Sequence, residues 1–186
     1  MTDITFVSIA FFLGAAIITW LSRRPLRHPG SHGFYRYFVW QGILILFIFH
    51  HPLWPSSALE TPKYLSSILM PVSLFLVLAG WFELNRKGCA SPNRKDEALF
   101  KFEKTTALVS SGIFRYIRHP MYTSLLLLAW GAFCQKPTVP GIVVVVLTTL
   151  FLFLTARADE RECQMYFGET YQSYKQKTWA FVPFVY

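Results

Sequence analysis

Five apolar runs occupy nearly half of this 186-residue chain and restrict what it can fold into. The first covers residues 4–21 without a charged residue, which is long enough to cross a hydrocarbon core of about 30 Å. Further runs cover residues 38–54, 64–84, 121–135 and 139–155. A segment in lipid must satisfy its backbone polar groups internally, so we expect each run to be a helix. The sequence predicts an all-α, polytopic membrane protein with five transmembrane helices.

Composition supports this class. Hydrophobic residues make up 53% of the chain and charged residues 15%, against a usual charged share of about 25%. A soluble domain of this length has too little interior to hide so much apolar surface, and the length fits one domain over residues 1–186. A signal peptide would have basic residues before its apolar run, whereas here Arg23 and Arg24 follow it. We therefore expect a retained first helix.

The Lys and Arg residues predict the orientation. Of the 18, 16 fall in the polar region after the first run, in residues 85–120 and in residues 157–186, and only Lys63 and Lys136 fall on the other side. By the positive-inside rule, the N-terminus is outside and the C-terminus is cytoplasmic. This topology accounts for the net charge of +8, so the basic balance does not indicate nucleic acid binding.

Short connectors bring the polar segments together. Three residues, Lys136 to Thr138, separate the last two runs, which predicts a tight helical hairpin. The hairpin places residues 85–120 beside residues 157–186, which we expect to form cytoplasmic helices. A polar connector containing Pro and Gly is expected over residues 26–37. Two polar segments that converge beside an apolar interior are typical of a site for a polar cofactor and a lipophilic substrate.

Metal and disulfide chemistry are not indicated. Cys89, Cys134 and Cys163 are scattered without a CxxC pair, so we expect free thiols. His50 and His51 are adjacent and do not share a helical face, and no Cys or Glu lies near them. The sequence therefore predicts no metal site.

A first charged block covers residues 108–122, at the start of the fourth run. Its centre is the tripeptide Arg-His-Pro at residues 118–120. Proline suits a first helical turn, and a helix N-terminus beside Arg and His favours an anion. The same tripeptide recurs at residues 27–29, so it is not distinctive alone. Anchoring to lipid head groups is the alternative for Arg115 and Arg118.

A second block follows the last run. It begins with charged residues and continues with aromatic rings at helical spacing: Arg157, Asp159, Glu160, Arg161, Glu162, Phe167, Tyr171 and Tyr174. A solvated helix end and packing of the rings at the bilayer interface are the alternatives to a functional role.

Together the two blocks resemble the integral-membrane methyltransferases related to isoprenylcysteine carboxyl methyltransferase and phospholipid (phosphatidylethanolamine) N-methyltransferase. The first part of the pattern is Leu108-Val109, Gly112, Tyr116, Arg118-His119-Pro120-Met121-Tyr122 and Gly131. The second part is Glu160, Phe167-Gly168-x-x-Tyr171-x-x-Tyr174 and Pro183. The resemblance covers roughly residues 80–183. Residues 88–92 resemble a lead-in of bacterial members, so we expect a bacterial inner-membrane protein.

The resemblance implies S-adenosylmethionine as cofactor, bound at the cytoplasmic face, and a lipid-facing opening for the substrate. The cofactor-binding residues it implies are Leu108, Val109, Gly112, Tyr116, His119, Pro120, Tyr122, Gly131 and Glu160. The catalytic residues it implies are Arg118, Glu160 and Tyr122. Asp159 and Cys163 depart from the residues usual at their positions in the family, a second Glu and a Leu.

Several acceptors and two other protein classes remain open at this point. Methyl transfer from a sulfonium is an in-line displacement that needs alignment and desolvation. A phospholipid amine is favoured as acceptor and would lose its proton to Glu160 or Tyr122, while a prenylcysteine-type carboxylate or a small thiol needs no strong base. A sterol-reductase-like NADPH enzyme and a non-enzymatic membrane scaffold are the other classes. Nothing in the sequence sets the oligomeric state.

Overall fold

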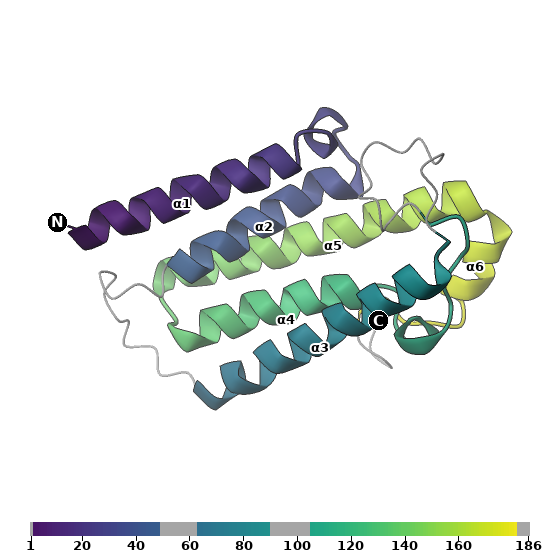
Figure 1. The fold of residues 1–186 in the computed structure, drawn as a ribbon. Helices are drawn as coiled ribbons and strands as arrows, with labels where there is room; N and C mark the ends of the chain where they lie inside the picture. Colours follow the sequence, from purple (N-terminus) through teal and green to yellow (C-terminus); the bar gives the residue numbers. More distant parts are fainter. Residues whose placement is uncertain (1, 49–62, 90–104, 182–186) are drawn as a thin grey trace.

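The computed structural model describes residues 2–48, 63–89 and 105–181, and within these ranges the chain is almost entirely helical. The α-helices are α1 (Thr2–Leu21), α2 (His32–Ile48), α3 (Lys63–Lys87), α4 (Pro120–Gln135), α5 (Val139–Phe167) and α6 (Glu169–Lys175). Short 3-10 turns, η1 (Pro25–Arg27) and η3 (Gly112–Arg115), precede α2 and α4. Figure 1 shows α1 to α5 side by side in an elongated bundle with α6 at one end. The all-α prediction is confirmed for the described residues.

Three of these helices are long and apolar enough to cross a membrane, over Ile4–Leu21, Tyr64–Lys87 and Val139–Phe167. The described part of α2 has 17 residues and α4 has 16, below the roughly 20 of a full span. The chain is therefore a helical membrane protein, while the five-span topology stays a prediction. Residues 49–54 of the second run, most of the lead-in and Pro183 lie outside the described residues.

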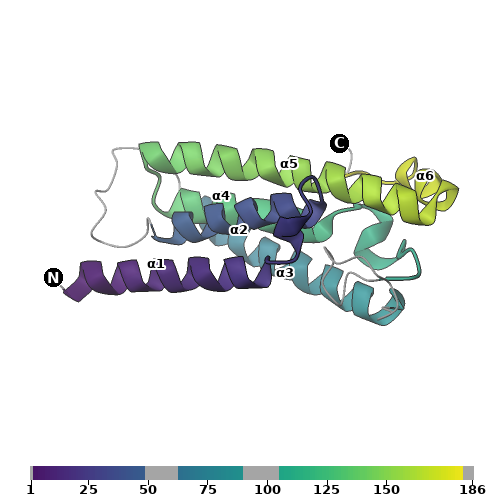
Figure 2. The ribbon, with the colours of Figure 1, turned by 90° about the horizontal axis from the view of Figure 1, so that it is seen from above.

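The helices pack as two close pairs, α3 on α4 and α2 on α5, with α4 also contacting α2 and α5. Figure 2 shows α1 at one edge of the bundle and α5 at the opposite edge. The span of α1 contains no buried residue, as expected of a helix that is apolar all round and faces lipid. The core lies between α2, α4 and α5 and contains Val39, Ala129, Val145 and Leu152.

The second helix begins earlier than expected. Residues 32–37 belong to α2 and not to the predicted connector. The Glu162 carboxylate of α5 accepts a hydrogen bond from the backbone N–H of His32 at 2.8 Å, and its second oxygen lies 2.6 Å from His32 Nδ1. A carboxylate at a helix N-terminus satisfies an unpaired N–H and stabilises the helix dipole. The capping residue lies 130 residues away in the sequence, so no local sequence pattern predicts this helix start.

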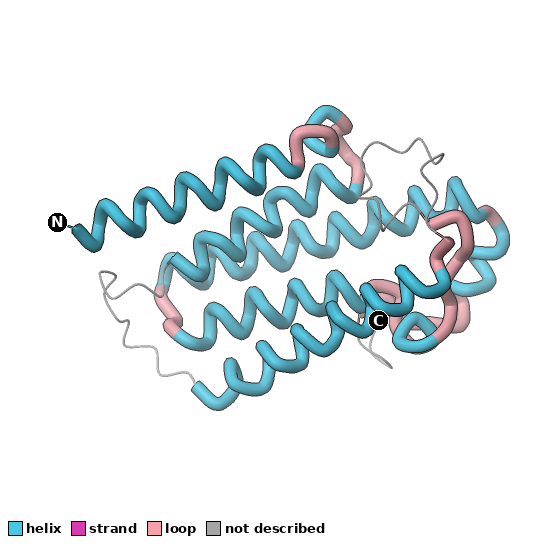
Figure 3. Tube along the Cα trace, viewed as in Figure 1, coloured by secondary structure: helices cyan, strands magenta, loops and turns pink. Residues whose placement is uncertain are grey.

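The last long helix runs past the predicted end of its span at residue 155. It has 29 residues, which is about 44 Å and longer than the hydrocarbon core. At its start Pro occupies the first turn and the Thr138 side chain caps Gly141 N–H. It ends at Phe167 because Gly168 has φ +57°, a conformation that residues with a Cβ rarely adopt. Figure 3 shows this turn leading into α6 at the end of the bundle.

Close helix contact predicts that Gly42 cannot be replaced without loss of stability. A Cβ added at Gly42 would lie 2.1 Å from Thr148 Oγ1 at the α2–α5 interface. We expect Gly42→Ala to destabilise the fold by about 1–3 kcal/mol, as over-packing does. Thermal unfolding in detergent, followed by circular dichroism, measures the effect.

The matched control is Gly14→Ala, also in an apolar helix, where the added Cβ meets only the end of the flexible Leu44 side chain. The thermal midpoint of this variant should stay level or rise, because Ala is more favourable than Gly inside a helix by about 1 kcal/mol. Equal midpoints for the two variants would contradict the close α2–α5 contact.

Candidate functional site

The C-terminal segment pairs with the loop that leads into α4. Trp179 N–H donates to the Tyr116 carbonyl at 3.1 Å, and Arg118 N–H donates back to the Trp179 carbonyl at 2.7 Å. His119 N–H donates to the Ala180 carbonyl at 3.1 Å. These bonds place the first charged block directly beside the end of the second. The predicted convergence of the two polar segments is therefore present in the structure.

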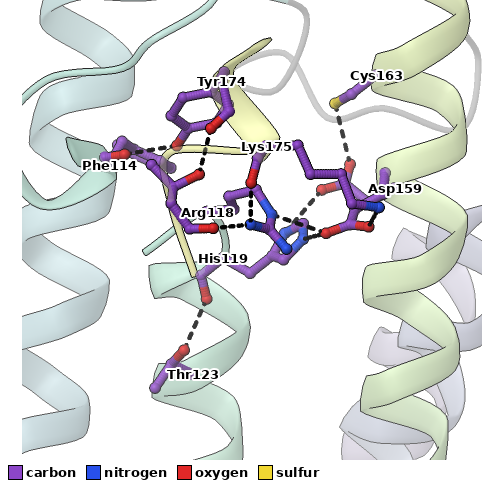
Figure 4. Close-up of polar contacts among 10 residues, drawn as sticks. Phe114, Arg118, His119, Thr123, Asp159, Cys163, Tyr174 and Lys175 are labelled. Atoms are coloured by element: carbon purple, nitrogen blue, oxygen red, sulfur yellow. Dashed lines mark hydrogen bonds and ion pairs between the residues drawn. The ribbon is translucent and has the colours of Figure 1, made fainter. Parts of the chain in front are cut away.

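Arg118 joins the two blocks through its side chain. Its Nε donates to Glu160 Oε1 at 2.9 Å, and its Nη1 donates to the carbonyls of Lys175 and Thr178. The Lys175 ammonium contacts the other oxygen of Glu160. Figure 4 shows Arg118 at the centre of this set, between the start of α4 and the C-terminal half of α5. The guanidinium thus orders the loop, because it ties the start of α4 to Glu160 and to two carbonyls of the C-terminal segment.

His119 is buried between two carboxylates. Its Nδ1 lies 3.3 Å from Asp159 Oδ2, and its Nε2 lies 3.4 Å from Glu160 Oε1. The ring stacks on Tyr122 at 5.3 Å between centroids. Burial lowers the pKa of His119, but hydrogen bonds to Asp159 and Glu160 and their charges outweigh it and raise the pKa above 6.5. The imidazole is therefore held as a cation more readily than a free histidine.

A cavity of about 400 Å³ lies beside this network. Eight residues of the first block line it: Leu108, Val109, Phe114, Arg118, His119, Pro120, Met121 and Tyr122. Six residues of the second block also line it: Asp159, Glu162, Cys163, Phe167, Tyr171 and Tyr174. Both blocks that the sequence singled out thus supply walls of one cavity.

The two tyrosines that α6 contributes to the cavity wall are uncharged. Burial raises the pKa of both Tyr171 and Tyr174 above the usual value for tyrosine, so both keep their hydroxyl protons. Tyr174 donates its hydrogen to the Phe114 carbonyl at 2.7 Å and thereby fixes the turn η3 (Figure 4). The aromatic face predicted over α6 is therefore part of the cavity and not a surface facing the lipid interface.

Four of the residues proposed from the sequence lie off the wall. Tyr116 is 52% exposed, and Glu160 lies behind Arg118 and His119. Gly112 faces Glu83, whose carboxylate occupies the place that a Cβ would take, 2.0 Å away. Gly131 lies at the α3–α4 interface, where an added Cβ would come 2.9 Å from Met70 Cγ.

Helices α2 and α3 supply wall residues that the sequence analysis missed. Arg36 and Trp40 come from α2, and Val77 and Leu84 come from α3. The sequence pattern predicts Arg36 in a connector, as one of the cytoplasmic charges. The spacing of His32, Arg36 and Trp40, four residues apart on one helical face, is the signal that could have indicated it.

In the part of the chain that the structure describes, no group of three or more His, Cys, Asp or Glu side chains is placed to hold a metal ion. None of the three cysteines forms a disulfide within the described residues. The wall instead offers two carboxylates, cationic groups and aromatic rings, a donor and acceptor set suited to a polar organic molecule.

These features define an integral membrane protein with a ligand-sized cavity between its helices and two polar segments at one end. The sequence matches the family model described as phospholipid methyltransferase over residues 67–170, more than half of the chain. The chain therefore belongs to the phospholipid methyltransferase family, which confirms the family predicted from the two blocks. Membership also supports the prediction of a methyltransferase enzyme.

Curated relatives of the chain are named methanethiol S-methyltransferases. One from a Pseudomonas species is 29% identical over 77 residues, which is 41% of this chain and 29% of the relative. One from Bradyrhizobium diazoefficiens is 27% identical over 71 residues, 38% of this chain and 24% of the relative. One from Crocosphaera subtropica is 26% identical over 72 residues, 39% of this chain and 28% of the relative. Each match spans less than a third of the relative's own length.

The raised pKa of His119 predicts a pH-dependent stability. A histidine whose pKa is raised on folding stabilises the fold below its ordinary pKa of 6.5 and loses that contribution as the pH rises through the folded value. We expect the thermal midpoint of the wild type to fall as the pH rises above 6.5, and His119→Gln to flatten this slope. Unfolding scans across this pH range measure both.

His28→Gln is the control, since His28 belongs to the other Arg-His-Pro tripeptide and is exposed. Its slope should equal that of the wild type. A wild-type slope that persists unchanged in His119→Gln would show that another group titrates.

Proposed function

We propose that the chain is an S-adenosylmethionine-dependent methyltransferase that acts on a membrane-partitioned acceptor. The observation that carries the proposal is the cavity of about 400 Å³, because it joins both family blocks to the apolar helices. Small-molecule sites are commonly cavities of about 300–1,000 Å³ with apolar walls and a few convergent polar groups. The cavity offers polar groups to a polar methyl donor and apolar surface to a lipophilic acceptor.

The wall residues fit the proposed donor. S-adenosylmethionine supplies a methyl group on a sulfonium, which is electrophilic enough to need no covalent help from the protein. The rings of Tyr122, Phe167 and Tyr171 offer faces for an adenine, and Asp159 offers acceptors for hydroxyl or ammonium groups. The N-terminus of α4, beside His119, favours a carboxylate.

Within this proposal, the residues implied as catalytic take different roles. Tyr122 lines the cavity and contacts the reactants. Arg118 and Glu160 are positioning residues, since Arg118 donates hydrogen bonds to Glu160 and to carbonyls of the C-terminal segment. Of the cofactor-binding residues, Leu108, Val109, His119 and Pro120 stay proposed as contacts.

The relatives change the order of the proposed acceptors. Proteins named methanethiol S-methyltransferases favour a small thiol, and the family description favours a phospholipid amine. We place the thiol first, because a thiol that has ionised to a thiolate reacts without a general base. An ammonium group would have to lose a proton to a base, and Tyr171 and Tyr174 on the wall are protonated and cannot accept it.

We also propose the five-span topology, with the N-terminus outside, the α4–α5 hairpin, and both polar blocks at the cytoplasmic face of a bacterial inner membrane. The distribution of 16 basic residues against two and the three-residue connection between α4 and α5 support it. Alkaline phosphatase is active only outside the cytoplasm, so a fusion at Lys136 should be active and one at the C-terminus inactive. The reverse pattern would overturn the orientation.

Binding of the methyl-transfer product tests the function. Purified protein in nanodiscs should bind S-adenosylhomocysteine in a calorimetric titration. His119→Ala should weaken that binding about tenfold or more, since it removes the cation beside the N-terminus of α4, and a charge-assisted interaction is worth about 1.5–3 kcal/mol. His28→Ala is the matched control and should bind like the wild type, because His28 does not line the cavity.

A flat titration for the wild type would exclude the proposed donor. If the product binds, a labelled methyl donor supplied with methanethiol or with phosphatidylethanolamine vesicles identifies the acceptor. Label in neither product would reject both acceptors, and only the donor assignment would remain.

A further inference from the structure

Residues 178–181, here called the C-terminal strap, follow α6 and lie outside residues 67–170 that match the family model. The strap is not helical, yet its last two described residues, Ala180 and Phe181, are only 2% and 5% exposed. Buried backbone groups need hydrogen-bond partners, and a non-helical segment must find them outside itself. The partners of the strap lie around the start of α4, where His119 stands.

The Thr123 hydroxyl fastens the strap to the first turn of α4. Thr123 is 5% exposed, and its Oγ1 donates to the His119 carbonyl and to the Phe181 carbonyl, each at 3.0 Å. Figure 4 shows the first of these contacts. The His119 carbonyl also accepts the backbone N–H of Thr123 at 2.9 Å, so the helix keeps its own bond without the hydroxyl. The hydroxyl therefore matters most for the contact between α4 and the strap.

The strap holds His119 by its backbone and by its ring. The His119 N–H donates to the Ala180 carbonyl at 3.1 Å, and the imidazole packs against the Phe181 ring with centroids 5.9 Å apart. The Phe181 ring also contacts that of Phe153 on α5, at 5.0 Å. Together with the stacked Tyr122 ring, Phe181 restricts how the imidazole can turn.

The charged groups around the imidazole do not fix its place tightly. Asp159 and Glu160 of α5 lie 3.3 and 3.4 Å from its two nitrogens, which is long for a hydrogen bond. Arg118 and Lys175 also bind the Glu160 carboxylate and compete for it. Contacts of this length tolerate rotation of the ring, so the packing by the strap decides where the His119 ring points.

We propose that Thr123 and Phe181 are positioning residues of the donor site and act through His119. Fastened by the Thr123 hydroxyl, the strap holds the imidazole in the orientation that meets the carboxylate of the donor. This inference rests on the proposed function, which gives His119 its contact with S-adenosylmethionine. Neither Thr123 nor Phe181 is among the residues that line the cavity. Their effect is preorganisation, because a group already held in place need not be ordered when the ligand binds.

Removal of the Thr123 hydroxyl tests the role of the strap. Thr123→Val has a similar shape but cannot donate to the Phe181 carbonyl. In nanodiscs, we expect it to bind S-adenosylhomocysteine about threefold to tenfold more weakly than the wild type, the range that loss of one hydrogen bond implies. Thr123→Ser keeps the hydroxyl and should bind within about twofold of the wild type. Phe181→Leu removes the ring and should weaken binding like Thr123→Val.

A double-mutant cycle separates positioning of His119 from a general structural role. In a His119→Ala background, Thr123→Val should weaken the remaining binding by less than about twofold, because the group that the strap positions is already gone. A residue that only supports the fold would weaken binding by the same factor in both backgrounds.

Thr155→Val is the matched control. Thr155 is also buried in an apolar helix, and its hydroxyl donates at 2.7 Å to the Phe151 carbonyl of that same helix. It does not line the cavity. This variant should bind S-adenosylhomocysteine within about twofold of the wild type.

The titration of His119 in ligand-free protein gives a second readout. Histidine NMR follows it, and the signal is assigned by its absence in His119→Gln. Burial lowers the pKa of His119, and contacts with Asp159 and Glu160 outweigh it and raise the pKa above 6.5. A loosened ring loses these contacts, so His119 in Thr123→Val should titrate closer to 6.5. Thr123→Ser and Thr155→Val should titrate like the wild type.

Three results would overturn the inference. The first is a Thr123→Val protein that binds S-adenosylhomocysteine like the wild type. The second is a loss of binding that is equally large in the His119→Ala background. The third is an unchanged titration of His119 in Thr123→Val.

Two other outcomes leave the inference testable. If Thr123→Val does not fold, Phe181→Leu takes its place in the cycle and in the titration, since its backbone can keep the bond to Thr123. A flat titration of the wild type with S-adenosylhomocysteine refutes the proposed function instead. The NMR titration of His119 then still decides whether the strap holds the ring.

Discussion

The pairing of the pre-α4 loop with the C-terminal segment is the interaction on which the rest of the site depends. Charged groups beside a membrane interior are costly unless they are paired. Here Glu160 gathers Arg118, His119 and Lys175 around one carboxylate, and the backbone of Tyr116–His119 bonds to that of residues 179–180. The bonds fix both sides of the cavity at once. If the pairing were lost, neither polar block would have a defined place at the end of the bundle.

A second tie, between Glu162 and His32, brings α2 into the site. It caps the helix N-terminus and sets the register of α2 on α5, which the close contact of Gly42 with Thr148 then maintains. The register places Arg36 and Trp40 on the cavity wall. An arginine that belongs to no family motif thereby becomes part of the cavity wall. Packing in the apolar part of the bundle thus contributes to the chemistry that the polar end can perform.

The apolar runs and the two blocks were predictable because each leaves a strong local pattern. A run of apolar residues forms a helix in lipid whatever surrounds it, and α1 and α3 follow their runs closely, while α5 begins with its run and extends beyond it to Phe167. The blocks at Arg118–Tyr122 and Glu160–Tyr174 also lie together as expected. Motif membership was less informative about individual roles. Gly112 and Gly131 allow close approach of Glu83 and Met70, not of a ligand, and Tyr116 faces outward.

The sequence by itself determined the helical membrane class, the family and the two blocks that meet. All of these follow from hydrophobicity and from residues close together in the chain. Only the tertiary structure decided that α2 begins at His32 and that Arg36 lines the cavity. It also decided that Arg118 donates its hydrogen bonds to Glu160 and to backbone carbonyls of the protein. Each depends on contacts between segments more than 40 residues apart, and such contacts are set by how the helices pack.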